Sequence, residues 1–205
     1  MKYTLVADGP SDAVLLSVLN WSLRRRGITP VVPQRADFRR VPRVRGIEQR
    51  LRIALRLYPC DVLFVHRDAE AQPAEMRREE ITNALRWTDV PHVPVIPIRM
   101  TEAWLLGDEF AIRSAAGNPN GVMSLNLPDL RRLEVLPDPK RILFDTLTAA
   151  CGLNARRRAT LPVRQMAHLI PNYIDDYSRL NTLRAFRTLQ EDVGRLVESR
   201  GDTSE

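Results

Sequence analysis

Short apolar runs alternate with stretches of helical periodicity over the first half of the chain. Strands are predicted at 3–7, 28–32, 61–66 and 93–98. Helices are predicted at 12–26, 47–58, 73–87 and from 101 to 106, where apolar residues recur every three or four positions. This alternation predicts an α/β fold, in which a parallel sheet of about four strands carries helices on both faces.

Two of these strands differ in character. The run DVLFVH at 61–66 is continuously apolar, which is typical of a central strand in a parallel sheet. The run at 93–98 contains Pro94 and Pro97, which indicate an irregular or edge strand because proline donates no ladder hydrogen bond. The stretch at 33–45 is predicted to be a basic loop.

The pattern changes at about residue 118. A loop rich in Gly, Asn and Pro follows, then a connector, and then helices predicted at 140–150, 162–170 and 182–199. We therefore expect one domain at 1–117, a helical C-terminal extension at 118–200 packed on it, and a disordered tail at 201–205.

Composition restricts the class of protein. The chain has 205 residues, of which 44% are hydrophobic, enough for one good core. No apolar run approaches the roughly 20 residues that span a bilayer, and the N-terminus lacks the pattern of a signal peptide. Cys60 and Cys151, the two cysteines, fit a reduced protein rather than a disulfide scaffold, so we expect a cytoplasmic location.

The charge favours an anionic partner. The net charge is +6 and the isoelectric point is about 10.0. Five arginines of the basic loop are candidates for binding a nucleic-acid backbone without sequence selectivity: Arg35, Arg39, Arg40, Arg43 and Arg45. The alternative is a solvated surface, or one that faces another subunit of a homo-oligomer.

Acidic residues follow three of the predicted strands. Asp8 and Asp12 flank the turn after the first strand, Asp68 and Glu70 follow the third, and Glu102 follows the fourth. Parallel strands place their carboxyl ends at one edge of the sheet, so these five side chains are expected to share a crevice. Crowded carboxylates repel one another, and hard cations such as Mg²⁺ or Mn²⁺ relieve that repulsion.

Each position also has a simpler interpretation. Asp12 is equally consistent with a helix cap, Glu102 with an acid favoured by the helix dipole, and the Asp68–Glu70 pair with a solvated loop. His66 is more typical of a packed histidine than of a ligand. Zinc is not expected, because the chain has three histidines and no His/Cys spacing.

Together these residues resemble the TOPRIM domain. The resemblance is carried by Asp8-x-x-x-Asp12, by Asp68-x-Glu70, by Glu102 within EAWLLGD and by the later Pro139-Lys140. The arrangement is most similar to the OLD (overcoming lysogenisation defect) family nucleases and to small stand-alone TOPRIM-like bacterial proteins of unknown function. Residues 1–110 carry the resemblance well, and the remainder only loosely, through IDDYSRL around Asp176.

The resemblance implies a Rossmann-like catalytic domain with two metal ions, Mg²⁺ or Mn²⁺. According to this resemblance, one ion would be held by Asp8, Asp12 and Asp68, and the second would be completed by Glu70 and Glu102. Lys140 would lie near the scissile phosphate. That lysine could equally be solvated at a helix start. The family has Glu at the position of Asp8 and Asp at that of Glu70, so the site is either a working variant or one that has lost its chemistry.

Three functional classes follow. The leading hypothesis is a metal-dependent TOPRIM-type nuclease, a hydrolase that cuts DNA or RNA as the effector of a bacterial anti-phage defence system. The second is a non-catalytic or regulatory subunit that binds an ABC or AAA ATPase, as the resemblance also implies. A nucleotide-binding Rossmann module is the weakest, because Gly9 is the only glycine of the first turn and Gly-x-Gly-x-x-Gly is absent.

Overall fold

The computed structural model describes residues 1–39, 41, 44–70 and 72–201. These residues form two compact units. The first contains Met1–Ile96 together with the segment from Thr188 onward, and the second contains Pro97–Arg187. The boundary expected at 117/118 lies inside the second unit. The tail expected at 201–205 lies outside the described residues except for Gly201, which ends the last helix.

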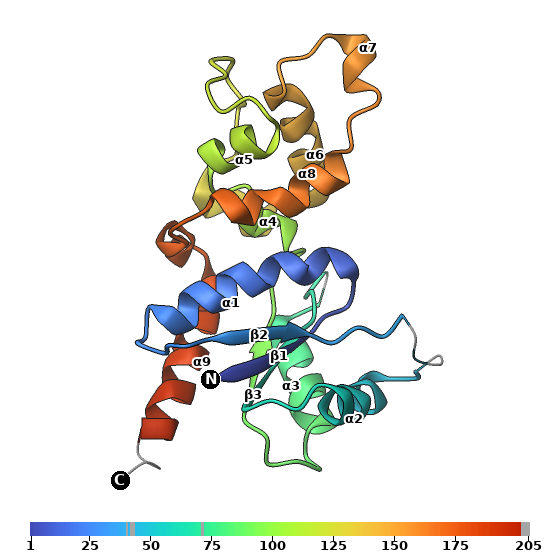
Figure 1. The fold of residues 1–205 in the computed structure, drawn as a ribbon, viewed down its shortest axis with the longest axis vertical. Coiled ribbons are helices and arrows are strands. Elements are labelled where there is room, and N and C mark those ends of the chain that lie inside the picture. The colour runs from blue at the N-terminus through green and yellow to red at the C-terminus, as the bar shows by residue number, and fades with distance from the viewer. Residues whose placement is uncertain (40, 42–43, 71, 202–205) are drawn as a thin grey trace. The chain divides into compact units, whose positions relative to one another are not determined.

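A four-stranded parallel sheet is the centre of the first unit, as predicted (Figure 1). Its strands are β1 (Lys2–Val6), β2 (Val32–Arg35), β3 (Val62–His66) and β4 (His92–Val95), in the order β2-β1-β3-β4. All five residues of β3 are buried, which explains its continuous apolar run. β4 lies at an edge, where its Pro94 is tolerated.

Helices cover both faces of this sheet. On one face, apolar residues of α2 (Ile47–Leu57) and α3 (Ala74–Ala84) pack with Leu63 and Val65 of β3. On the other, α1 (Leu15–Arg24) follows the 3-10 turn η1 (Pro10–Val14), and Tyr3 of β1 donates hydrogen bonds from its hydroxyl to α1. Figure 1 shows α1 and the α2–α3 pair on opposite sides of the strands.

The second strand is the main error of the sequence prediction. It was expected at 28–32, but β2 begins at Val32 and extends into the stretch expected to be a loop. β2 is an edge strand whose residues are exposed or only half-buried, so it needs no apolar run. Its pairing with β1, in which Val32 lies beside Lys2, determines its position instead. The helix expected at 12–26 also begins later, because η1 precedes it.

The second unit is helical in the part that the structure describes. Its elements are α4 (Glu102–Leu105), α5 (Glu109–Ala115), η2 (Leu130–Val135), α6 (Pro139–Ala150), α7 (Ala155–Arg158), α8 (Val163–Leu169), η3 (Ile170–Tyr173), η4 (Ser178–Thr182) and the start of α9 (Arg184–Gly201). α5 and α7 were not predicted. The side chain of Asp108 caps α5 by accepting the N–H of Ala111 at 2.9 Å. Among the described helices, none is long and apolar enough to cross a membrane.

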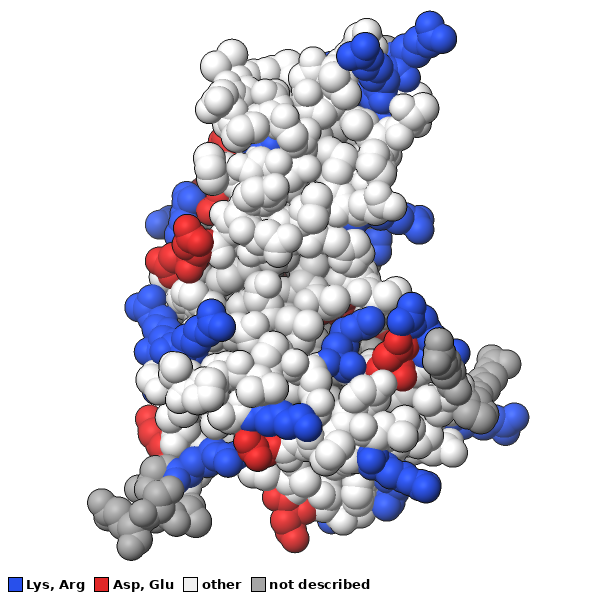
Figure 2. Space-filling view, in the orientation of Figure 1, with Lys and Arg blue, Asp and Glu red and all other residues white. Residues whose placement is uncertain are grey.

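The surface charge is mixed. On the face drawn in Figure 2, acidic side chains lie among basic ones at several places. Ion pairs such as Arg39–Asp37 at 2.5 Å and Arg52–Glu48 at 2.9 Å join exposed groups of the first unit. Such exposed pairs contribute little to stability, so the buried pairs are the ones that matter.

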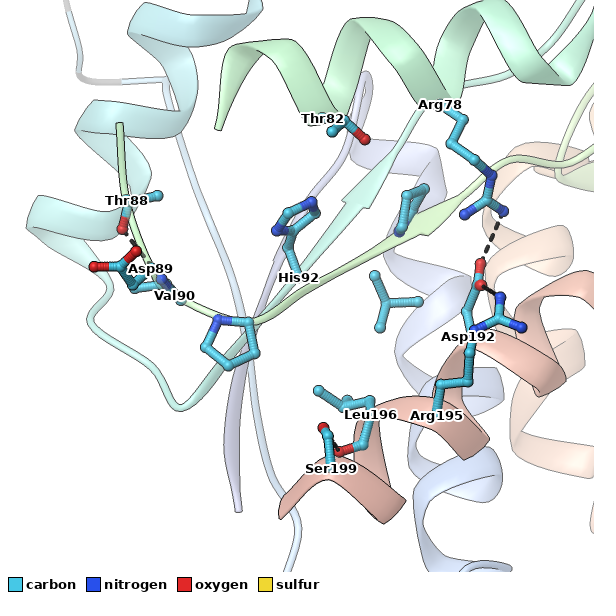
Figure 3. A pocket seen from close by; sticks show the side chains of 13 residues that line it. Arg78, Thr82, Thr88, Asp89, Val90, His92, Asp192, Arg195, Leu196 and Ser199 are labelled. Carbon is cyan, nitrogen blue, oxygen red and sulfur yellow. Dashed lines mark hydrogen bonds and ion pairs between the residues drawn. The ribbon is translucent and has the colours of Figure 1, made fainter. Parts of the chain in front are cut away.

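A buried ion pair connects α3 to α9 within the first unit. Asp192 of α9 is 8% exposed, and its Oδ2 lies 2.8 Å from Nη2 of Arg78 on α3. Arg195 also contacts this carboxylate. Figure 3 shows these three side chains at one end of a hollow of about 620 Å³ beside β4. Because the charged groups there bind one another, we interpret this end of the hollow as a structural contact.

Asp192→Ala is therefore expected to lower the free energy of unfolding by about 2 kcal/mol, because it leaves the half-buried guanidinium of Arg78 without its carboxylate. Urea denaturation followed by circular dichroism measures the change. The matched control is Glu191→Ala, on the exposed side of the same helix, with an expected effect within about 0.5 kcal/mol. Equal effects of the two substitutions would contradict a structural role for the pair.

Candidate functional site

The candidate site lies past the carboxyl ends of β1 and β3. These strands are neighbours, and their register places Val6 beside Val65. Asp8, two residues after Val6 of β1, therefore lies beside Arg67, two residues after Val65 of β3. The carboxyl end of a parallel sheet is where open α/β folds bind ligands. The sheet thus brings residues from two separate parts of the chain to one place.

His66 joins two of the candidate acids. It is the last residue of β3 and is 1% exposed. Its Nδ1 lies 3.4 Å from Oδ2 of Asp12, and its Nε2 lies 3.2 Å from Oδ1 of Asp68. Burial alone would lower the pKa of His66, but the hydrogen bonds and charges of the two carboxylates outweigh it and raise that pKa to about 9. The ring is therefore an imidazolium at neutral pH.

Asp12 points inward. Its side chain accepts the N–H of Gly9 at 2.7 Å and the hydroxyl of Ser11 at 3.3 Å, which closes the turn after β1. Burial raises the pKa of Asp12. His66 and the hydrogen bonds from Gly9 and Ser11 lower that pKa by more than burial raises it, so the net shift is downward. Asp12 thus stabilises the turn, close to the capping role that was its alternative interpretation, and also faces His66.

Asp8 lies between two arginines and is the most accessible acid of this group. Its side chain is 44% exposed, with Oδ2 3.2 Å from Nε of Arg67 and Oδ1 3.8 Å from Nη1 of Arg50. Burial raises the pKa of Asp8, the charges of Arg67, His66 and Arg50 lower it, and the charge of Asp68 raises it. The net shift is upward, and Asp8 and Asp68 are close enough to repel one another.

The two acids of the Asp68-x-Glu70 motif have different surroundings. Asp68 contacts His66, and its side chain is 20% exposed. Glu70 has a left-handed φ of 54°, a 71% exposed side chain, and its nearest basic contact is Arg77 at 4.0 Å. Arg77 also binds Glu80 of α3, which in turn binds Arg67. Glu70 therefore lies at the exposed margin of a network of alternating charges.

Glu102 and Lys140 bind one another within the second unit. Nζ of Lys140, in the first turn of α6, lies 3.0 Å from Oε1 of Glu102, in the first turn of α4. Glu102 is 9% exposed, so the lysine neutralises a nearly buried carboxylate. The structure thus joins two residues that the sequence singled out separately, and it does so within one unit.

The arginines proposed for nucleic acid are only partly described. Arg40 and Arg43 lie outside the described residues. Arg35 ends β2, Arg39 is bound to Asp37, and Arg45 is exposed. A second basic group was missed: Arg156, Arg157 and Arg158 of α7. Figure 2 shows basic side chains projecting where Figure 1 places α7.

Sequence reasoning also missed Arg50 and Arg67. Arg50 is half-buried on α2, where a helical pattern marks it only as a polar position. Arg67 directly follows the most strand-like segment, and that position was a usable signal. Both contact Asp8, and they line a cavity of about 240 Å³ with His66 and Glu80.

The donor set of the described residues is smaller than the expected cage of five carboxylates. Among the described residues, no three His, Cys, Asp or Glu side chains form a group that could hold a metal. Mg²⁺ needs less, since it is often bound by one or two carboxylates with water and substrate phosphates. Asp8, which is 44% exposed, and Asp68, which is 20% exposed and close enough to raise the pKa of Asp8, are the two carboxylates of this region that such an ion would use.

Comparison with family models, with curated proteins and with solved structures finds no match for this chain.

The raised pKa of His66 predicts a pH dependence of stability. A histidine whose folded pKa is about 9, above its ordinary 6.5, contributes stability that is fully present below pH 6.5 and lost as the pH rises through 9. The free energy of unfolding of metal-free protein should fall over this window by on the order of 3 kcal/mol. Urea denaturation across the window measures it.

The control for this prediction is His66→Gln, which keeps a polar side chain but cannot carry a charge. The free energy of unfolding of this variant should fall much less over the same window, because the titrating imidazole is absent while every other titrating group is retained. A fall of the same size in both proteins would show that His66 is not the charged group between Asp12 and Asp68.

Proposed function

We propose that the protein is a metal-dependent nuclease of the TOPRIM type, which hydrolyses phosphodiester bonds of DNA or RNA as the effector of a bacterial anti-phage defence system. The observation that carries the proposal is the placement of Asp8 and Asp68 past the ends of the neighbouring strands β1 and β3. Asp8 is accessible there and lies beside two arginines that match the charge of a phosphate, and the side chain of Asp68 is partly exposed.

In this proposal Asp8 and Asp68 would hold one Mg²⁺ or Mn²⁺ ion. Such an ion would supply charge neutralisation at the phosphoryl group and a water of lowered pKa. His66 orients Asp68 and, through Asp12, the turn that carries Asp8. Glu70, Glu102 and Lys140 are assigned no step here; the ion pair of Glu102 with Lys140 holds α4 against α6.

Asp68→Asn should reduce Mg²⁺- or Mn²⁺-dependent cleavage of DNA or RNA by about 100-fold or more, because the amide replaces a charged metal ligand. Its near-identical shape preserves the contact with His66. Cleavage is measured on labelled single-stranded and duplex substrates in each metal.

The matched control is Glu79→Gln, which removes one carboxylate charge from an exposed position of α3 and should leave the rate unchanged. Cleavage retained by Asp68→Asn would remove Asp68 from the site. Wild-type protein that cleaves none of the substrates in either metal would contradict the nuclease proposal.

One observation favours a second candidate, a non-catalytic or regulatory subunit of an ABC or AAA ATPase. Each of the five acids singled out from the sequence contacts a basic side chain within 4.0 Å. An acidic site compensated in this way is stable without metal. Because the chain has no Gly-x-x-x-x-Gly-Lys loop, ATP hydrolysis would belong to the partner.

The nucleic-acid contact is expected to involve α7. Arg156, Arg157 and Arg158 are exposed, and among the residues described no carboxylate pairs with them. Replacing all three by Gln should weaken binding and reduce the slope of log K against log salt by about 2–3, roughly one per lost phosphate contact. Fluorescence anisotropy in EDTA measures binding without cleavage.

The loop expected from the sequence provides the comparison. Replacing Arg39 and Arg45 by Gln should reduce the slope by only about 1, because Asp37 already neutralises Arg39. An unchanged slope in the α7 variant would show that this helix does not contact the nucleic acid.

A further inference from the structure

A cavity at the carboxyl ends of β1 and β3 is lined by charged side chains of both signs. It encloses about 240 Å³ and is bordered by Arg50, Arg67 and His66, with Asp8 and Glu80 as the acidic members. Two arginines therefore meet two carboxylates, while both ring nitrogens of His66 already face Asp12 and Asp68. Arginine only donates hydrogen bonds, so a ligand of these two groups must supply acceptors.

Two hydrogen-bond donors of this lining have no acceptor in the described part of the chain. Nε of Arg50 and Nε of Arg67 are buried and make no hydrogen bond to the described part of the chain. Arg67 Nε lies 3.2 Å from Asp8, but its N–H is not directed at that carboxylate closely enough for a hydrogen bond. Buried donors almost always have a partner, so each guanidinium group has hydrogen-bonding capacity that the described part of the chain does not use.

Arg50 is the least compensated of the cations. Its carboxylate contact, to Asp8, is 3.8 Å long, whereas Arg67 binds Glu80 at 2.9 Å. Its position is nevertheless well defined, since its guanidinium stacks 4.6 Å from the ring centre of Phe38 and donates to the carbonyl of Ala7. A half-buried cation that is held in place and has a weak counter-charge attracts an anion.

We propose that this cavity binds a phosphoryl group through the guanidinium groups of Arg50 and Arg67. A phosphoryl group offers several acceptor oxygens and matches the planar fork of arginine in geometry and charge. When the group belongs to a nucleic acid, the inference rests on the proposed function. Binding of inorganic phosphate without metal does not require that function.

Asp8 occupies the place of the anion in the absence of ligand. It contacts both arginines, and its exposed side chain can turn away toward solvent. Glu80 is different, because Arg67 and Arg77 hold it from two sides. Removing the charge of Asp8 should therefore free both arginines, and it should strengthen phosphate binding although it removes a proposed metal ligand.

Other occupants fit the lining less well. Water satisfies donors, but it leaves the charge of Arg50 uncompensated. A metal ion is repelled by the two guanidinium groups, and the metal proposed above would lie on the side of Asp8 and Asp68. A neutral organic ligand would need several acceptors and would still not balance the charge.

The test is isothermal titration calorimetry of the whole protein with inorganic phosphate, in EDTA and at low salt. Wild-type protein should bind. Arg50→Gln should weaken binding by about ten-fold or more, and Asp8→Asn should tighten it by about five-fold. The matched control is Arg56→Gln, which removes the same charge from an exposed position of α2 and should change the affinity by less than about two-fold.

A second arm identifies the source of the phosphoryl group. Oligonucleotides with a 5′-phosphate or a 5′-hydroxyl are compared in EDTA. A terminal phosphate is the source if only the phosphorylated oligonucleotide loses affinity in Arg50→Gln, and an internal phosphate is the source if both lose affinity equally.

Three results would overturn the inference: no phosphate binding by wild-type or Asp8→Asn protein, equal losses in Arg50→Gln and Arg56→Gln, or weaker binding in Asp8→Asn. These titrations measure binding in EDTA, and cleavage is measured separately, so the two proposals can fail independently. Phosphate binding without nuclease activity would contradict the proposed function alone. Cleavage without phosphate binding would contradict only this inference.

Discussion

Charge compensation at the carboxyl ends of β1 and β3 is the constraint on which the rest of the site depends. The parallel sheet brings acids from two strands together, and like charges at close range disfavour folding unless something neutralises them. The protonated His66 does this from inside, since it is buried between Asp12 and Asp68. Arg50 and Arg67 do it from the cavity side, where they contact Asp8.

This compensation has two layers that differ in exposure. The inner layer is buried: Asp12 binds His66 and the backbone of the turn at once, so it is part of the fold. The outer layer is accessible at Asp8, whose side chain is 44% exposed and lies 3.2 Å from Arg67 and 3.8 Å from Arg50. In the proposed function, a metal ion and a phosphate would exchange with the outer layer and leave the contact of Asp12 with His66 intact.

The sequence predicted the layered architecture well, because two of its signals are local. The continuous apolar run of β3 and the helical period of α2 both correspond to observed elements. β2 was misplaced because it is an edge strand with exposed side chains, and its pairing with β1 determines its position.

The candidate site was predicted only in part, because some of its contacts follow from the sheet and others depend on the packing of helices. The rule that parallel strands share one edge is enough to place Asp8 and Asp68 near one another. It does not identify their neutralising partners, because those come from other elements: Arg50 from α2, and Lys140 of α6 for Glu102. Such contacts depend on how helices pack, which no local pattern encodes. His66 was expected to be a packed histidine, and it is buried, but between two carboxylates.

A crystal structure with Mn²⁺ and phosphate, recorded at the manganese absorption edge, would show whether ligands replace the contacts of Asp8. We expect an anomalous peak coordinated by Asp8 and Asp68, with Arg50 and Arg67 turned from Asp8 to phosphate and with His66 still between Asp12 and Asp68. Crystals in which Asp8 stays bound to both arginines, with no manganese at either carboxylate, would contradict this expectation.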